Sequence, residues 1–182
     1  MSRWIAFLRA INAGRGRTVR MEGLLRAFES LGYSGVRTFM ATGNVVFETT
    51  AQNTRMLERR IENKLRESLG IEVPTFIRSD AQVAEIADYL PFQASENDAA
   101  ELNIIFLADE LDEQQVQKLM ALKTGADEFH VHGREIYWLR RRKPGGSAFS
   151  SVPLEKTIGL PFTIRGSRTV KKLAEKYHPG KS

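Results

Sequence analysis

The sequence predicts an α+β protein of two tandem ferredoxin-like units, each with the element order βαββαβ, with a linking helix between them and a C-terminal helix. Three observations support this fold class. Short apolar runs of strand length alternate with amphipathic helix patterns, turn signals separate neighbouring strands, and the same order of elements occurs in both halves. The repeat lies in element order, because the two halves share almost no residue identity.

The first half contains four strand-like runs and two helix patterns. The strands are expected over residues 4–8, 35–40, 44–48 and 73–78. The apolar helix faces are formed by Met21, Leu24, Leu25, Phe28 and Leu31, and by Leu57, Ile61, Leu65 and Leu69. Gly32 and Gly70 each stand between two apolar residues at the end of a pattern, where a left-handed glycine commonly stops a helix. The first half therefore has the order βαββαβ.

The second half has the same order. A capping box of Ser79 and Gln82 is expected to open the linking helix, and Asp112 to cap a later one. The strands are expected over residues 103–107, 128–132, 135–139 and 162–165, and the remaining helices over 151–158 and 170–177. We therefore divide the chain into a first unit over 1–79, a linking helix and loop over 80–101, and a second unit with the C-terminal helix over 102–182. The two units can also pack as one globular domain.

Composition excludes several classes of protein. The chain has no cysteine, which removes disulfides, thiolate metal sites and cysteine nucleophiles. No apolar run approaches the length of a membrane span, and the N-terminus lacks the apolar core of a signal peptide. We expect a soluble, cytoplasmic protein without membrane association and without a cofactor.

The net charge of +5 is unevenly distributed. Residues 1–42 carry +5, residues 43–133 carry −9 and residues 134–182 carry +9. If the two basic ends meet in space, they form one cationic face, which is typical of proteins that bind phosphate groups. The alternative is ordinary solvated charge, and the sequence leaves both open.

A Gly/Arg segment after the first strand is the clearest candidate binding site. Gly14 and Gly16 allow backbone amides to point at one anion, while Arg15 and Arg17 supply forked donors. The segment precedes a helix, whose N-terminus favours anions. It has neither the Walker nor the dinucleotide-binding spacing. The alternative is a surface turn without a ligand.

Further cations and polar side chains join this candidate site. Arg9 and Asn12 end the first strand pattern, and Asn44 opens the adjacent third strand. Asn44 also fits a purely structural role in a Gly-Asn turn. Arg165 and Arg168 form a C-terminal cluster with Lys171 and Lys172. The candidate anion-binding or phosphate-binding residues are therefore Arg9, Asn12, Gly14, Arg15, Gly16, Arg17, Asn44, Arg165 and Arg168.

Catalytic and metal signals are weak. His130 and His132 lie on the same strand face, an arrangement that can hold zinc, but no third ligand is evident and a plain strand is favoured. No histidine and acid pair points to an activated serine. We assign no metal site and leave open whether the protein is an enzyme.

Three stretches of the chain form recognisable motifs: Leu8-Arg9-Ala10-Ile11-Asn12 with Gly14, Thr38 to Phe47 with its Thr-Gly-Asn-Val-Val-Phe run, and Leu154-Glu155-Lys156 with the later Arg165 to Val170. By these motifs the chain resembles a mostly bacterial family known as domain of unknown function 1697. The chain departs from the family pattern at Ala10, at Ala148 and at Gly166-Ser167. The resemblance implies the fold and the boundaries, and no activity.

The sequence therefore favours binding of a phosphorylated ligand or nucleic acid through the Gly/Arg segment and the C-terminal cations. Two alternatives stay open. The first is an enzyme that acts on a small phosphorylated or carboxylated substrate in a cleft between the units. The second is a protein-interaction module whose sheet edges pair with a partner or with a second copy in a homodimer.

Overall fold

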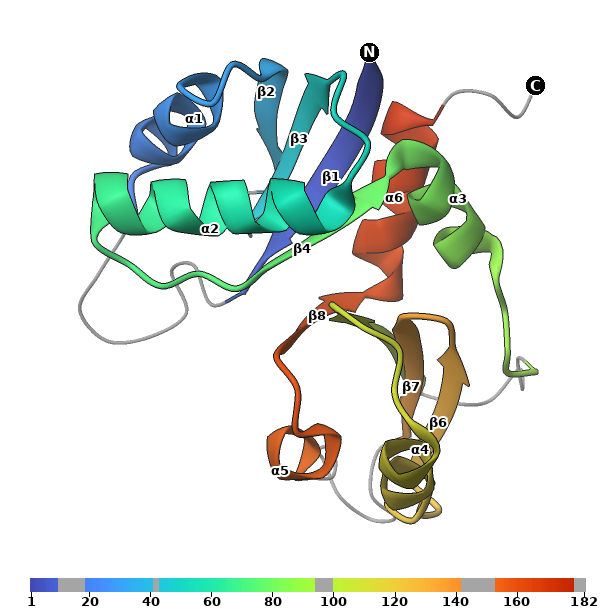
Figure 1. Ribbon diagram of the computed structural model, residues 1–182. Helices are drawn as coiled ribbons and strands as arrows, with labels where there is room; N and C mark the ends of the chain where they lie inside the picture. The colour runs from blue at the N-terminus through green and yellow to red at the C-terminus, as the bar shows by residue number, and fades with distance from the viewer. Residues whose placement is uncertain (10–18, 41–42, 94–99, 142–152, 179–182) are drawn as a thin grey trace. The chain divides into compact units, whose positions relative to one another are not determined.

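The computed structural model describes residues 1–9, 19–40, 43–93, 100–141 and 153–178. Within these residues the chain is an α+β protein with two four-stranded antiparallel sheets and six helices (Figure 1). By contacts it divides into two compact units, one of residues 1–85 with 173–182 and one of residues 86–172. The element order in each unit is compatible with a ferredoxin-like arrangement.

The first sheet has the strand order β2-β3-β1-β4. Its elements are β1 (Ser2–Leu8), α1 (Met21–Glu29), β2 (Ser34–Phe39), β3 (Asn44–Thr49), α2 (Thr54–Leu69) and β4 (Thr75–Ser79). On one face, alternate residues of β1 (Trp4, Ala6 and Leu8) pack with the apolar faces of α1 and α2 (Figure 1). Residues 4–8 form a continuous apolar run in the sequence, and the alternation of a strand directs every second side chain into the core between the sheet and the two helices.

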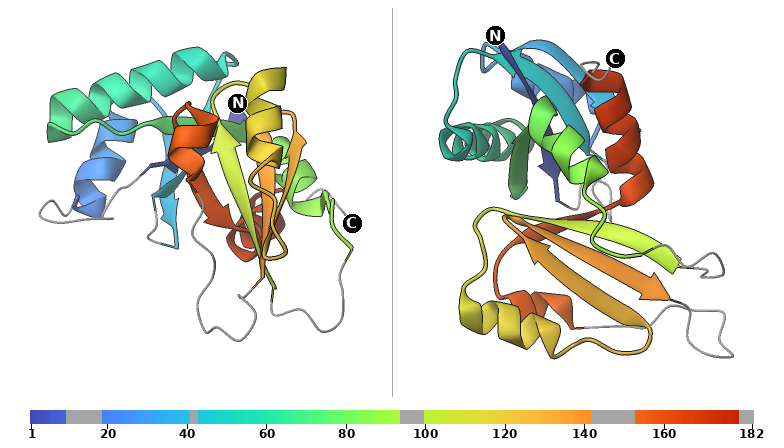
Figure 2. Two further views of the ribbon diagram at one scale, coloured as in Figure 1. Left: turned by 90° about the horizontal axis from the view of Figure 1, so that it is seen from below. Right: turned by 90° about the vertical axis from the view of Figure 1, so that its right-hand side faces the viewer.

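The second sheet repeats this topology with the order β6-β7-β5-β8. Its elements are β5 (Ala100–Leu107), α4 (Glu113–Met120), β6 (Asp127–His132), β7 (Glu135–Arg141), α5 (Leu154–Ile158) and β8 (Phe162–Gly166). Ile105 and Leu107 of β5 pack with Leu119 of α4 and Ile158 of α5, so that both helices cover one face of the sheet (Figure 2). Each unit therefore has its own apolar core.

One further helix directly follows the last strand of each sheet. α3 (Asp80–Asp88) follows β4, and α6 (Ser167–Tyr177) follows β8. The boundary between the two units falls inside each of these helices. The last residues of α3, from Ile86 on, belong to the second unit, and the last residues of α6, from Leu173 on, belong to the first. The sequence-based division had placed residues 80–101 in a separate linker and the whole of α6 in the second unit.

The last turn of α6 lies against the face of the first sheet opposite α1 and α2. Arg37, Val46 and Ile5 stand side by side in the strand register, as do Phe39, Asn44 and Phe7. The ring of Tyr177 meets that of Phe39 edge to face, with the centroids 5.9 Å apart. Arg3 donates from Nη1 to the Tyr177 carbonyl at 2.9 Å. These contacts join the first strand of the chain to its last helix.

Side chains close the outer edge of β4. The amides of Thr75, Ile77 and Ser79 point away from β1, because the intervening residues bond to it. Glu62 and Glu58 of α2 accept from Thr75 N at 2.9 Å and from Ile77 N at 3.0 Å. Gln82 accepts from Ser79 N at 2.9 Å. All three outward N–H groups are therefore occupied, which closes this edge to another strand.

An Ile-Arg pair recurs at equivalent places in the two sheets. Arg78 stands opposite Ile5 in the register, and Arg165 stands opposite Ile104. Nη1 of each arginine donates to the carbonyl of the preceding isoleucine, at 2.9 Å for Arg78 and 2.8 Å for Arg165. The repeat thus extends from element order to one pair of residues in each terminal strand.

Most of the predicted helix ends are confirmed. Gly70 adopts the left-handed conformation and ends α2 as predicted, and Gly159 ends α5 in the same way. The capping boxes at Ser79 and Asp112 both form, each with a glutamine three residues later. Gly32 is left-handed as expected, with a φ of 83°, but the regular part of α1 ends three residues before it. The helix ends at Glu29 because tighter i→i+3 bonds, including Gly32 N to Glu29 O, replace the last α-helical turn.

Candidate anion-binding surface

The Gly/Arg segment leaves the sheet at a well-fixed point. Leu8 N donates to Gly43 O at 2.8 Å, and Arg9 N donates to Pro74 O at 2.9 Å, so both neighbouring strands hold the end of β1. The half-buried Arg9 is the last residue described there. Five candidate residues lie outside the described part of the chain: Asn12, Gly14, Arg15, Gly16 and Arg17.

Asn44 has a structural partner. Its side chain is fully buried, and Nδ2 donates to the Phe39 carbonyl at 3.2 Å across the connection between β2 and β3. The amide therefore stabilises this turn, as its place beside Gly43 also suggested. The expected neighbour of Asn44, Asn12, lies outside the described residues.

The two C-terminal arginines of the candidate set have different environments. Arg165 is turned toward its own strand, where Nη1 donates to Thr163 Oγ1 and to the Ile164 carbonyl, both at 2.8 Å. Burial lowers the pKa of the Arg165 guanidinium to about 10, so it is still charged at neutral pH. Arg168 lies in the first turn of α6 and is exposed to solvent.

The exposed side of α6 is strongly basic. Four cations are exposed along this helix, against the single exposed acid Glu175: Arg168, Lys171, Lys172 and Lys176. None of the four forms an ion pair with a carboxylate in the described part of the chain. Their charge is therefore available to an external anion.

Cations from the two basic ends of the sequence meet at the end of α6. The Arg37 guanidinium lies 5.5 Å from the centre of the Tyr177 ring, and Lys176 Nζ lies 5.4 Å from the same centre. Lys176 Nζ is also 5.5 Å from the centre of the Phe39 ring. We call these four residues the Tyr177 cluster. Its rings hold both cations through cation–π contacts, worth about 0.5–1 kcal/mol each at exposed sites.

The Tyr177 cluster has no ion-paired carboxylate among the described residues. Glu48, on the neighbouring strand, pairs through Oε1 with Arg3 at 2.9 Å. Within the described residues neither Arg37 nor Lys176 forms an ion pair. Sequence analysis missed this cluster. The charge of the two chain ends was the available signal, but it could not identify which residues meet.

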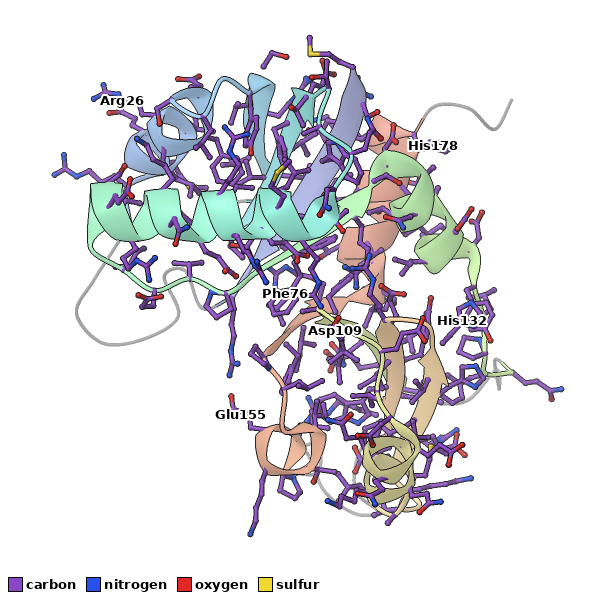
Figure 3. The ribbon with its side chains drawn as sticks, in the orientation of Figure 1. Arg26, Phe76, Asp109, His132, Glu155 and His178 are labelled. Atoms are coloured by element: carbon purple, nitrogen blue, oxygen red, sulfur yellow. The ribbon has the colours of Figure 1, made fainter. Side chains whose placement is uncertain are left out.

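The two histidines of β6 pack with an aromatic residue. The hydroxyl of Tyr89 lies 2.7 Å from His130 Nε2, and its ring stacks on that of His132 with the centroids 4.1 Å apart. His132 lies on the outer strand of its sheet (Figure 3). The described ranges contain no group of three or more His, Asp or Glu residues able to hold a metal ion.

A buried tyrosine lies beside these histidines. Tyr137 donates from its hydroxyl to the Ile86 carbonyl at 3.1 Å and is fully buried. Burial, reinforced by Glu135, raises the pKa of the Tyr137 phenol well above its usual value of 10.0. The phenol is therefore neutral and acts as a fixed donor at neutral pH.

These features define a two-sheet α+β protein with a basic C-terminal helix. None of its described helices is both long and apolar enough to cross a membrane. The chain belongs to the family described as "Protein of unknown function (DUF1697)", whose model matches residues 1–137. No curated protein matches the chain.

A solved structure shares the fold. It is that of the conserved bacterial protein SP0830 from Streptococcus pneumoniae, with a TM-score of 0.72 and 20% sequence identity. The match covers 98% of this chain and 99% of the other. At this identity the likeness shows the common architecture.

Proposed function

We propose that this protein binds a phosphorylated ligand or nucleic acid through cations of its first sheet and C-terminal helix, on a frame of two tandem ferredoxin-like units. The observation that carries the proposal is the Tyr177 cluster, where Arg37 and Lys176 share one ring without a paired carboxylate. Two cations that contact one ring and have no paired carboxylate among the described residues leave their positive charge available to an anion. Phosphate groups are common anions that neutralise such charge.

The rest of the proposed surface extends from this cluster along α6. Arg168, Lys171 and Lys172 continue the line of exposed cations toward its N-terminus. We propose that the Gly/Arg segment, with Asn12 and residues 14–17, binds the same ligand. Arg9, at the end of β1, directly precedes this segment. We keep Arg165 and Asn44 in the candidate set, and each of them is bonded to a backbone carbonyl of its own unit.

Salt-dependent binding tests the proposal. Fluorescence anisotropy with a short labelled duplex DNA, and separately a single-stranded RNA, is expected to show binding that weakens steeply as salt rises. The paired variant Arg37→Gln with Lys176→Gln removes two cations, so the log–log salt slope on duplex DNA should become shallower by about 1.8. Thermal shift with nucleotides and sugar phosphates distinguishes a small ligand from a polymer.

A matched control uses two exposed arginines of the helical layer. Arg26 projects from α1 on the opposite side of the first sheet (Figure 3), and Arg59 is exposed on α2. The pair Arg26→Gln with Arg59→Gln changes the net charge equally and should leave the salt slope unchanged. The proposal is wrong if neither polymers nor small phosphates bind, or if the control pair weakens binding as much as the Tyr177 cluster pair.

A further inference from the structure

The outer strand β6 carries backbone groups without partners. β6 and β7 form a hairpin in which Ala126 O accepts from Arg141 N. This bond shows which residues of β6 direct their backbone groups toward β7 and which direct them away from it. Residues 128, 130 and 132 bond to β7, so Phe129 and Val131 direct their N–H and C=O groups outward. Within the described part of the chain, neither residue has a hydrogen-bond partner on that side.

The stretch of unpaired backbone groups on β6 is bounded by a turn at each end. At the start of β6, Thr124 Oγ1 accepts from Asp127 N at 3.0 Å, while Thr124 N donates to Asp127 O at 2.9 Å. At the other end the strand turns at Gly133, whose φ of 59° fits the first central position of a tight hairpin turn. The edge therefore offers two donors and two acceptors, centred on His130.

The other three sheet edges are less suited to strand addition. The side chains of Glu58, Glu62 and Gln82 occupy the amides of β4. On β8, the Ile164 carbonyl accepts from Arg165. On β2, the register shifts between Ser34 and Arg37, and a bulge of this kind disrupts the ladder. β6 has a regular register, and its sequence contains no lysine or proline that would block pairing.

We propose that β6 pairs with β6 of a second copy of this chain, antiparallel about a two-fold axis at His130, joining two sheets into one. In this register Phe129 stands opposite Val131 of the second copy, and the reverse pair is equivalent by symmetry. Each pair exchanges two hydrogen bonds, so all the open groups of both edges become satisfied. Shifting the register by two residues would place an open residue opposite Asp127 or Gly133.

The side chains support a second copy as the occupant. On the helix-covered face, the Phe129 and Val131 pair is an aromatic and β-branched contact, which favours antiparallel pairing by about 0.2–1 kcal/mol. On the other face Glu128 stands opposite His132 of the second copy. Glu128 already pairs with Arg141 at 3.1 Å and with Lys123 at 3.6 Å. The His132 ring stacks on Tyr89, so we count no new charge pair on this face. The symmetric spacing of the open backbone groups and the Phe129 and Val131 pairs are what favour a second copy as the occupant.

Analytical ultracentrifugation tests the association. The full-length chain is expected to show a concentration-dependent shift from monomer to dimer in the micromolar range. Val131→Pro removes only an outward N–H, a substitution that edge strands tolerate, and should yield a folded monomer. Val131→Thr keeps the N–H and the branched shape and should still dimerise. A wild-type chain that stays monomeric up to high micromolar concentration would overturn the proposal.

Cysteine cross-linking tests the register independently of whether Val131→Pro folds. The native chain has no cysteine, so every disulfide reports an engineered pair. Residues 128 and 132 of opposite copies form a non-hydrogen-bonded pair, with Cα atoms about 4.5 Å apart, which suits a disulfide. A mixture of Glu128→Cys and His132→Cys chains should therefore cross-link at least ten times faster than either chain alone. The exposed Gln117→Cys on α4 is the control. Equal rates for the mixture, the single variants and the control would refute this pairing.

Discussion

The buried carboxylate of Glu58 provides the sharpest test of how the first unit is held together. Glu58 is 4% exposed, and its Oε1 accepts from the buried amide of Ile77 at 3.0 Å. Glu58→Ala leaves that N–H without a partner in the core. An unsatisfied buried donor costs about 1–3 kcal/mol, and the lost bond is one to a charged group. The ion pair of Glu58 with the partly exposed Arg55, at 3.7 Å, adds at most about 1 kcal/mol.

We therefore expect Glu58→Ala to lower the free energy of unfolding by about 2–3 kcal/mol. Glu58→Gln keeps an acceptor oxygen and should cost about half as much. Urea denaturation followed by circular dichroism gives the free energies. Amide hydrogen exchange adds local resolution, since the Ile77 amide should exchange faster in Glu58→Ala than in wild type.

The control for this prediction lies on the same helix. Glu67 is exposed on α2, so Glu67→Ala removes a like charge without exposing a buried donor. If Glu58→Ala and Glu67→Ala unfold at the same urea concentration, or if exchange at Ile77 is unchanged, then the carboxylate does not cap the β4 edge as argued.

Three further predictions concern single residues. Asn44→Ala should lower the free energy of unfolding by about 1 kcal/mol, measured by urea denaturation, because it removes the buried amide bond to the Phe39 carbonyl. Asp112→Ala removes the capping box of α4 and should cost about 0.5–2 kcal/mol, with Asp112→Asn retaining most of that stability. Ultraviolet titration should show that Tyr137 stays protonated above pH 10. Because its pKa is raised on folding, wild type should lose stability relative to Tyr137→Phe as the pH rises above 10. An ordinary titration of all four tyrosines would contradict this.

Local chemistry explains which parts of the fold could be predicted from the sequence. The glycine at position 70 and the capping box at Asp112 act within one helical turn, so their residue types suffice. Short apolar runs likewise identified β1 and β5, which are inner strands of the two sheets. The left-handed Gly32 was predicted in the same way as Gly70, but the tightened turn between Glu29 and Gly32 was not, because no residue type marks it.

The tertiary contacts could not be predicted in the same way. The Tyr177 cluster joins β2 to the end of α6, and no local pattern indicates that Arg37 and Lys176 face one ring. The caps that Glu58 and Glu62 place on β4 look, in sequence, like ordinary charges on a solvated helix. In both cases the role of a charged residue depends on a partner distant along the chain.

The placement of the last turn of α6 on the first sheet has a consequence for biosynthesis. The ribosome completes residues 1–85 about 90 residues before it reaches Tyr177. At ordinary elongation rates this leaves the nascent N-terminal sheet for roughly 5–18 s without the ring that covers Phe39. During that interval Phe39 lacks its ring contact with Tyr177, and a stop codon before residue 173 would leave the finished product in the same state.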